Sequence, residues 1–329
     1  MTRRTFVSLA GGASASGSCG WRSGESDRPL RVIASPYIST LPIYFAQEAG
    51  HFADVGLAIE LEQYPSLPEV AALMAGGVVD AALMGLSPSF VNAIEKGAQV
   101  RCVAARVLAS TQCLGMLRLY ANASSFPDGL GDLKGLRGGT LAVSHRGSIS
   151  EFTADMLLAG SGMSTSDLDL VYLPEPEATA AVSVGRIDAM IASQFEQDLT
   201  SRSDSIVRGP SLGDVAPGFQ YGLVLFGQRL LDGNVDVGTR FLMAWFRGVR
   251  DFVQGATPQF AKEFAQDYNL DLGLISASCR DIFSLDGRLN SRDFQTYLDW
   301  TVRKGYCPPD IDLNKLLDER FVARMAELG

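Results

Sequence analysis

The strongest constraint on the fold is a module that occurs twice, in residues 72–85 and again in residues 180–193. Each copy has an amphipathic helical pattern, then Gly-x-(Val/Ile)-Asp-Ala, then a short apolar run. The glycine suits the left-handed residue that ends a helix, and the apolar run suits a buried parallel strand. Similar apolar segments, 32–35 and 140–143, precede the two copies. A duplicated β-α-β-α-β unit predicts two α/β lobes, with ligands bound between them at the carboxyl ends of the strands.

Length, charge and motifs limit the function classes. The chain has 329 residues, enough for two cores of ordinary size. Its formal net charge is −9, and an acidic surface repels phosphates, which argues against nucleic-acid binding. No run beyond the N-terminal segment has the apolar length needed to cross a membrane. No metal-ligand spacing, Walker loop or Ser-His-Asp set is recognisable, so we expect no metal, no cofactor and no enzymatic activity.

The first residues have the order of an export signal. Arg3 and Arg4 are followed by a weakly apolar stretch and then by small residues as far as Cys19. This order resembles a signal of the twin-arginine type, and it predicts an export signal and linker over residues 1–28. The expected location is periplasmic or extracytoplasmic. Cys19 follows a degraded lipoprotein cleavage box, so lipid anchoring stays open; the alternative is an N-terminal tail with two chance arginines.

The cysteines leave their pairing open. Five occur, none in a C-x-x-C pair, so a zinc ribbon or thioredoxin-like motif is unsupported. An exported location would permit bridges Cys102–Cys113 and Cys279–Cys307. The alternative is that these cysteines are small buried apolar residues.

Periodicity and turn residues predict the order of elements. Strands are expected at 31–35, 57–63, 81–84, 100–107, 113–120, 140–144, 168–173, 189–192 and 222–226. Helices are expected at 41–49, 68–76, 89–96, 149–159, 177–184, 237–254, 258–267, 291–304 and 313–328. The chain would cross between lobes near 113–120 and return near 222–226, forming a two-segment hinge. Lobe 1 would comprise residues 29–113 plus 223–329, and lobe 2 residues 114–222.

Four segments together resemble a known family. Residues 42–57 resemble its Ala-x-Glu-x-Gly-x-Phe…Gly-Leu signature, and residues 77–85, 133–148 and 316–321 resemble three further signatures. The family is the nitrate/sulfonate/taurine-type solute-binding proteins of ABC importers, which includes binders of thiamine pyrimidine precursors. The resemblance implies a type II periplasmic-binding-protein fold, a small-molecule ligand between the lobes, and delivery to a membrane permease.

Two loops of lobe 1 are candidate ligand contacts. Tyr37, Ser39 and Thr40 follow the first strand and precede a helix N-terminus, where free N–H groups favour an acceptor. Tyr37 could stack on a ligand, or the segment could be a capping turn with an exposed tyrosine. Gly85 and Ser87 follow the third strand, and the resemblance places ligand contacts there. Ser87 could instead only cap the helix.

The corresponding loop of lobe 2 follows its first strand and contains His145, Arg146, Gly147 and Ser148. Glycine lets the backbone approach a ligand, and Ser148 offers N–H and hydroxyl donors at a helix start. In the family this loop meets the polar head of the ligand. Arg146 would suit a carboxylate or sulfonate. The alternative is a solvated turn.

The last candidates are Gln194, Phe195 and Glu196, which follow the final strand of the repeat. Phe195 could form an apolar wall, and Glu196 could accept from an amine or a ring N–H, or be solvated. Arg146 and Glu196 favour ligands of opposite charge, so sulfonate, carboxylate, amine and heterocycle all stay open.

The sequence therefore predicts an exported, monomeric solute-binding protein. The alternatives are a ligand-sensing module for a receptor and an enzyme on the same fold, because relatives in the family include a pyrimidine synthase. That synthase consumes a histidine and uses a Cys-rich motif, whereas this chain has only His51 and His145 and no clustered cysteines. The first loop also lacks the Trp…Asn…His pattern of the pyrimidine binders. We expect His51 to be a helix C-terminal residue favoured by the dipole, not a catalyst.

Overall fold

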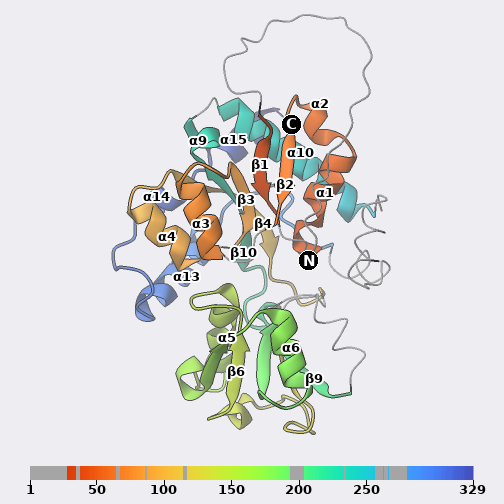
Figure 1. Ribbon diagram of the computed structural model, residues 1–329, viewed down its shortest axis with the longest axis vertical. Helices are drawn as coiled ribbons and strands as arrows, with labels where there is room; N and C mark the ends of the chain where they lie inside the picture. The colour runs from red at the N-terminus through yellow and green to blue at the C-terminus, as the bar shows by residue number, and fades with distance from the viewer. Residues whose placement is uncertain are drawn as a thin grey trace, which may run out of the picture.

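The computed structural model describes residues 28–34, 38–63, 67–85, 87–113, 117–192, 204–232, 235–255 and 280–328, together with Lys262 and Gln266. In this part of the chain the strands form two five-stranded sheets, with the orders β2-β1-β3-β10-β4 and β7-β6-β8-β5-β9. Each sheet and the helices packed on it form one lobe, and Figure 1 shows lobe 1 above lobe 2. The predicted α/β fold with two lobes is confirmed.

The strands are short and mostly buried. Lobe 1 contains β1 (Leu30–Ile33), β2 (Ile59–Glu62), β3 (Ala81–Met84), β4 (Val100–Leu108) and β10 (Gln220–Gly227). Lobe 2 contains β5 (Arg118–Asn122), β6 (Thr140–Val143), β7 (Asp169–Tyr172), β8 (Ala189–Ala192) and β9 (Ile206–Ser211).

The two sheets repeat one topology. In lobe 1, β1 pairs in parallel with β2 and β3, and β10 lies antiparallel between β3 and β4. In lobe 2, β6 pairs in parallel with β7 and β8, and β5 lies antiparallel between β8 and β9. Consequently β1, β3 and β4 run in the same direction, and their carboxyl ends lie at one edge of the sheet.

The aspartate of the repeated module has the same structural role in both lobes. The Oδ2 atom of Asp80 accepts a hydrogen bond from the Arg31 amide at 2.8 Å, and that of Asp188 accepts from the Thr140 amide at 2.8 Å. Each aspartate also donates its own N–H to the carbonyl of the same partner residue, at 2.9 and 3.1 Å. The aspartate thus fixes the start of the neighbouring central strand. The preceding glycines have the left-handed conformation: Gly77 (φ +68°) and Gly185 (φ +71°).

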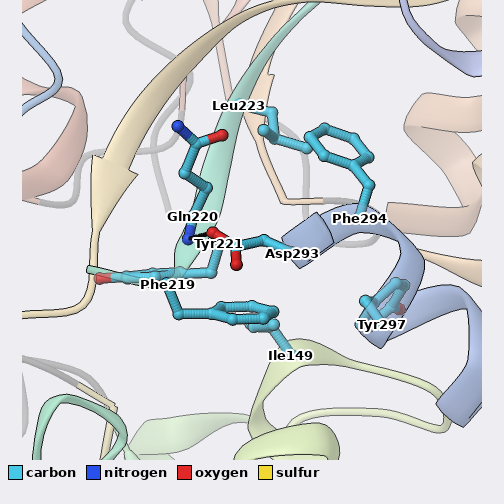
Figure 2. Close-up of a pocket in the computed structure, with 8 residues that line it drawn as sticks. All are labelled: Ile149, Phe219, Gln220, Tyr221, Leu223, Asp293, Phe294 and Tyr297. Atoms are coloured by element: carbon cyan, nitrogen blue, oxygen red, sulfur yellow. Dashed lines mark hydrogen bonds between the residues drawn. The ribbon is translucent and has the colours of Figure 1, made fainter. Parts of the chain in front are cut away.

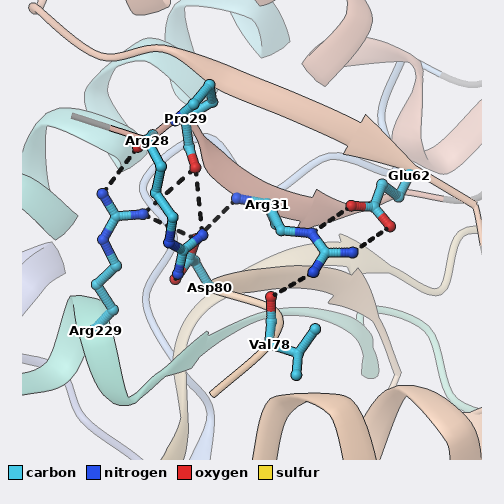
Figure 3. A network of polar contacts seen from close by, with 7 residues as sticks. All are labelled: Arg28, Pro29, Arg31, Glu62, Val78, Asp80 and Arg229. Carbon is cyan, nitrogen blue, oxygen red and sulfur yellow. Dashed lines mark hydrogen bonds and ion pairs between the residues drawn. The ribbon is translucent and has the colours of Figure 1, made fainter. Parts of the chain in front are cut away.

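Only the lobe 1 copy adds arginines to this aspartate (Figure 3). Asp80 is 1% exposed and accepts from Arg28 at 2.9 and 3.0 Å and from Arg229 at 3.2 Å. Beside it, Arg31 forms a bidentate pair with Glu62 at 2.6 and 3.0 Å, which joins β1 to β2. These contacts lie at the amino ends of β1 and β3, away from the edge where a ligand site is expected.

Changing Asp80 to asparagine tests the arginine contacts. The shape is kept but the charge is lost, so we expect the free energy of unfolding to fall by about 2 kcal/mol. The matched change Asp188→Asn affects a carboxylate without an arginine partner among the described residues, and we expect a loss of about 1 kcal/mol. Urea denaturation of both variants measures the difference, and equal losses would contradict the role given to the arginines.

Helices cover both faces of the lobe 1 sheet. Figure 1 shows α3, α4 and α14 on one side and α1, α2 and α10 on the other. Among the described residues, none of the helices is long and apolar enough to cross a membrane. The α-helices of lobe 1 are α1 (Leu41–Glu48), α2 (His51–Asp54), α3 (Leu67–Ala75), α4 (Pro88–Glu95), α9 (Gln228–Asp232), α10 (Val235–Val253), α13 (Ser291–Arg303), α14 (Leu313–Leu316) and α15 (Arg320–Leu328). Those of lobe 2 are α5 (Ile149–Ala159), α6 (Glu175–Ser183) and α8 (Leu212–Val215), and the 3-10 helices are η1 (Ile38–Thr40), η2 (Leu133–Leu136) and η3 (Thr165–Asp167).

The chain passes between the lobes twice. It leaves lobe 1 after β4 and enters β5, and it returns from β9 to β10 through α8. The strand expected at 113–120 is therefore partly wrong, because β5 begins only at Arg118 and Cys113 lies in the connection. The sequence pattern also missed β9, whose last four residues, Arg-Gly-Pro-Ser, include no aliphatic or aromatic side chain typical of a strand.

Neither predicted cysteine bridge is present. Cys102 and Cys307 are free and buried, whereas Cys113 is disulfide-bonded to a partner outside the described residues. The Cys102 side chain is fully buried within β4, and burial raises the pKa of its thiol far above the usual value. For Cys102 and Cys307 the alternative, that they serve as small apolar core residues, is the one observed.

The single C-terminal helix expected at 313–328 is also wrong. The structure divides it into α14 and α15, because the backbone between them pairs with the edge of the lobe 1 sheet. Leu317 forms a parallel bridge with Cys102, and the Asp318 amide donates to the Cys102 carbonyl at 2.9 Å. The helix expected at 258–267 lies outside the described residues, apart from Lys262 and Gln266.

His51 does not end a helix as expected. Gly50 has a positive φ of +80° and separates α1 from α2, so His51 is the first residue of α2. A favourable interaction with a helix dipole therefore does not explain the position of His51. Its Nε2 atom instead lies 2.6 Å from Oδ2 of Asp251, which connects α2 to the end of α10.

Candidate functional site

A pocket lies between the two lobes, at the carboxyl edge of the lobe 1 sheet (Figure 2). One wall comes from Ile149, the first residue of α5 in lobe 2, and the rest comes from the return connection, β10 and α13. The Asp293 carboxylate accepts a hydrogen bond from the backbone N–H of Gln220 at 2.9 Å, so α13 is linked to the start of β10 at this pocket. The lining residues are Ile149, Phe219, Gln220, Tyr221, Leu223, Asp293, Phe294 and Tyr297.

The predicted loop of lobe 2 reaches lobe 1 at Gly147. This residue has φ +74°, and a Cβ atom there would overlap Cγ of Pro88 in α4 and lie 2.9 Å from its Cδ. Its amide donates to Oε2 of Glu151 at 2.7 Å, and its carbonyl accepts from the Tyr297 hydroxyl at 2.6 Å. Glycine is needed here both for the left-handed backbone and for the close contact between lobes.

Ser148 begins helix α5, as the sequence predicts. Its hydroxyl accepts from the Glu151 amide at 3.2 Å and lies 2.8 Å from the Ser150 hydroxyl, and its side chain is 1% exposed. Among the described residues, the hydroxyl is thus fully engaged within lobe 2. The serine serves as a helix cap in this structure.

Glu151 connects the loop to the C-terminal part of lobe 1. The residue is fully buried, and its Oε1 atom accepts from the Tyr306 hydroxyl at 2.6 Å with Lys304 Nζ at 3.6 Å. Burial and the contact with the Glu151 carboxylate both raise the pKa of Tyr306 well above its usual value, so the phenol stays a donor. The loop is therefore held by one carboxylate that binds both lobes.

A second carboxylate on α5 extends this contact. Asp155 accepts from Trp300 Nε1 at 2.7 Å, from Lys304 Nζ at 2.9 Å and from the Thr165 amide at 2.6 Å. Burial acts to raise the pKa of Asp155, but these hydrogen bonds outweigh it and hold the pKa below its usual value. Helix α13 and the residues just after it thus dock on α5 through the carboxylates of Glu151 and Asp155.

His145 and Arg146 have different surroundings. Nδ1 of His145 lies 3.1 Å from the Ser144 hydroxyl, while Nε2 is buried and has no hydrogen-bond partner among the described residues. Burial lowers the pKa of His145, so the ring is neutral at pH 7 and can offer Nε2 to a ligand. Arg146 is exposed, and its guanidinium lies 4.8 Å from the centre of the Tyr306 ring. It belongs to the rim of the contact between lobes, not to its interior.

The loop after β1 is held by a buried arginine. Nη1 of Arg106, in β4, donates to the Ser39 carbonyl. Thr40 is 1% exposed and is the N-cap residue of α1. Sequence reasoning did not select Arg106, although a charge within the apolar run 100–108 is a signal that it could have used.

The loop after β3 lies against β10. A Cβ atom at Gly85 would lie 2.9 Å from the Tyr221 carbonyl, so glycine allows this close approach. Ser87 is 1% exposed and is the N-cap residue of α4, but its hydroxyl lies 2.6 Å from the Ser89 hydroxyl and does not bond to the helix backbone. It is thus not an ordinary side-chain cap.

The model of the NMT1-like family matches residues 23–194, just over half of the chain. The chain belongs to the NMT1-like family. No curated protein sequence matches it.

Solved structures confirm the type II periplasmic-binding-protein fold. The chain is similar to the aliphatic sulphonate-binding protein SsuA of Escherichia coli (15% identity, TM-score 0.70, 89% of this chain and 93% of that one). It is also similar to the alkanesulfonate-binding protein SsuA of Xanthomonas axonopodis pv. citri (16% identity, TM-score 0.71, 90% of this chain and 100% of that one). A third similar structure is the nitrate-binding protein NrtA of Synechocystis PCC 6803 (14% identity, TM-score 0.71, 91% of this chain and 88% of that one). The resemblance to nitrate/sulfonate/taurine-type proteins is therefore confirmed.

The structure of this NMT1-like protein brings residues 39–40, Gly85, Ser87 and the loop at 145–148 to the region between the lobes. Tyr37, Gln194, Phe195 and Glu196 lie outside the described residues. Among the residues that the structure describes, no group of three or more His, Cys, Asp and Glu could hold a metal ion.

Sequence reasoning missed the residues that position the lobe 2 loop. Glu151 follows Ser148 with the Ser-x-x-Glu spacing of a capping box, and this spacing could have been used. Its carboxylate departs from that motif, because it binds the Gly147 amide and not the amide of the cap residue. Tyr297 and Tyr306 carry no comparable signal, since their contacts join segments about 150 residues apart.

Proposed function

We propose that this protein is an exported solute-binding protein of an ABC importer, which captures a small organic molecule between its lobes and delivers it to a membrane permease. The observation that carries this proposal is the two-lobed arrangement in which the loop after β6 contacts lobe 1, beside a small pocket with walls from both lobes. The structural relatives named above bind sulfonates and nitrate, which supports the same kind of role.

The residues between the lobes combine apolar surface with few polar groups. Phe219, Leu223 and Phe294 provide apolar surface, and the loop between lobes contains the neutral ring of His145, whose Nε2 has no hydrogen-bond partner among the described residues. A sulfonate, a carboxylate or a nitrogen heterocycle would suit this combination of an apolar wall and few polar groups. Export by the twin-arginine type of signal, a periplasmic location and a monomeric state belong to the same proposal.

Native mass spectrometry of the purified protein tests this function. We expect a co-purified small molecule, whose binding calorimetry then reproduces and whose addition makes the protein more compact in X-ray scattering. Incubation should return the molecule unchanged. A chemically altered product would favour an enzyme on this fold, and a protein that neither retains nor binds any small molecule would contradict the proposal.

A further inference from the structure

Among the residues that the structure describes, Arg106 is a buried cation without a counterion. Its side chain is 5% exposed, Nη1 donates to the Ser39 carbonyl, and Nε has no hydrogen-bond partner in this part of the chain. None of the ion pairs formed by the described residues includes it. Burial lowers its pKa to about 10, so the group still carries its positive charge at pH 7.

Three arginines at the opposite edge of the lobe 1 sheet are paired with carboxylates. Arg28 and Arg229 share Asp80, and Arg31 binds Glu62, although each of these arginines is more exposed than Arg106. A buried charge is costly unless it is paired and hydrogen-bonded. A guanidinium at this depth, with one carbonyl acceptor among the described residues, is therefore incomplete as a purely structural group.

The guanidinium lies at the edge of the sheet that faces lobe 2. Arg106 is near the carboxyl end of β4, which runs parallel to β1 and β3, and it contacts the segment that follows β1. Its Nη2 atom lies 3.1 Å from where a Cβ of Gly222 would be, so glycine leaves room for it. Tyr221, the residue before Gly222, lines the pocket between the lobes, and it is close enough for the positive charge of Arg106 to oppose the rise that burial causes in the pKa of Tyr221.

We propose that Arg106 binds the anionic group of the solute, a carboxylate or a sulfonate. This inference rests on the proposed function and names its substrate class. A guanidinium offers five N–H donors in a plane, and the bond to Ser39 leaves Nε and other donors for an oxyanion. Arg106 would then supply the charge that the sequence pattern assigned to Arg146, which lies exposed against Tyr306.

Charged and uncharged probes of similar shape test this assignment. The full chain is titrated by calorimetry and by thermal unfolding with millimolar methanesulfonate or propionate, and with methanesulfonamide or propionamide as uncharged counterparts. We expect saturable binding of at least one anion and none of the amides. The two anions distinguish a sulfonate site from a carboxylate site.

Substitutions at Arg106 and Arg186 test which arginine provides the positive charge that binds the anion. We expect Arg106→Met to weaken anion binding roughly 10- to 100-fold, because a charge-assisted hydrogen bond is lost. Arg106→Lys keeps the charge but loses the planar donors, so an intermediate loss is expected. Arg186→Met, at an exposed arginine in the turn before β8, changes net charge equally and should leave binding unchanged. If Arg106→Met does not fold, the lysine variant decides.

Three results would overturn the assignment. Unchanged anion affinity in a folded Arg106→Met, or in the lysine variant where that one decides, would remove Arg106 from the site. A wild-type protein that binds the amides as well as the anions, or that retains only an uncharged or cationic solute in native mass spectrometry, would refute the anion while leaving the proposed function intact. A protein that binds no probe and retains no solute would refute both.

Discussion

Changing Gly147 to alanine is expected to weaken solute binding roughly 10- to 100-fold while both lobes stay folded. The added Cβ would overlap Cγ of Pro88 and lie 3.2 Å from Cδ2 of Tyr306, so the lobe 2 loop could no longer meet lobe 1. Relieving such an overlap costs about 1–3 kcal/mol, and it destabilises the state in which the two lobes are in contact. Calorimetry with the co-purified solute, together with X-ray scattering, measures the effect.

Gly162 provides the matched control. It lies in the same lobe with a similar φ of +67°, but no atom lies within 4 Å of the position of its Cβ. Gly162→Ala therefore has the same backbone cost, about 1 kcal/mol, without the contact between lobes. We expect a larger loss of stability from Gly147→Ala than from Gly162→Ala, because the overlap also weakens the contact between lobes, and a loss of affinity from Gly147→Ala alone. Equal affinities in the two variants would show that closure does not depend on this contact.

The repeated module made the central part of each sheet predictable from the sequence. Its glycine and aspartate act on neighbouring backbone, since the left-handed turn and the bond to the start of the central strand are local chemistry. The parallel order of β2-β1-β3 and of β7-β6-β8 follows from the same units. These elements depend on short-range patterns that occur in both copies.

The remaining strands and the cysteine pairing depend on contacts between distant segments. β9 ends in Gly-Pro-Ser and is stabilised by antiparallel pairing with β5, a neighbour about 90 residues earlier in the chain. Leu317 stops the C-terminal helix by pairing with Cys102, and nothing in its own segment indicates this. Periodicity reports which face of a segment is buried, but not what buries it.

The candidate site also has one part that the sequence predicts and another part that it does not. The loop at 145–148 was found from its position after a predicted strand and before a predicted helix, and the structure places it at the contact between lobes. The sequence does not predict the partners of this loop, which come from α13 and Tyr306, because their contacts exist only when the C-terminal part of lobe 1 meets α5. Arg106 could have been selected from the sequence, since an arginine inside an apolar strand requires a partner or a function.

Glu151 provides the prediction with the largest expected effect on stability. Its buried carboxylate accepts from Gly147 and Tyr306 at 2.7 and 2.6 Å, with Lys304 Nζ at 3.6 Å. Alanine would leave the Gly147 amide and the Tyr306 hydroxyl without this acceptor, while Lys304 would keep its contact with Asp155 at 2.9 Å. Removing one partner of a buried ionic contact costs about 3–5 kcal/mol. We expect Glu151→Ala to lower the free energy of unfolding by about 3 kcal/mol, because Lys304 retains some access to water.

Two further variants separate this role from the loss of any acidic residue. Glu177→Ala, at an exposed glutamate in the first turn of α6, should change the free energy of unfolding by no more than about 0.5 kcal/mol. Tyr306→Phe removes one donor and should cost about 1.5 kcal/mol, and far less once Glu151 is already alanine. Urea denaturation of the single and double variants gives this coupling. Additive losses would mean that the hydroxyl and the carboxylate do not act together, and that α13 is held on α5 by its aromatic packing against Phe152.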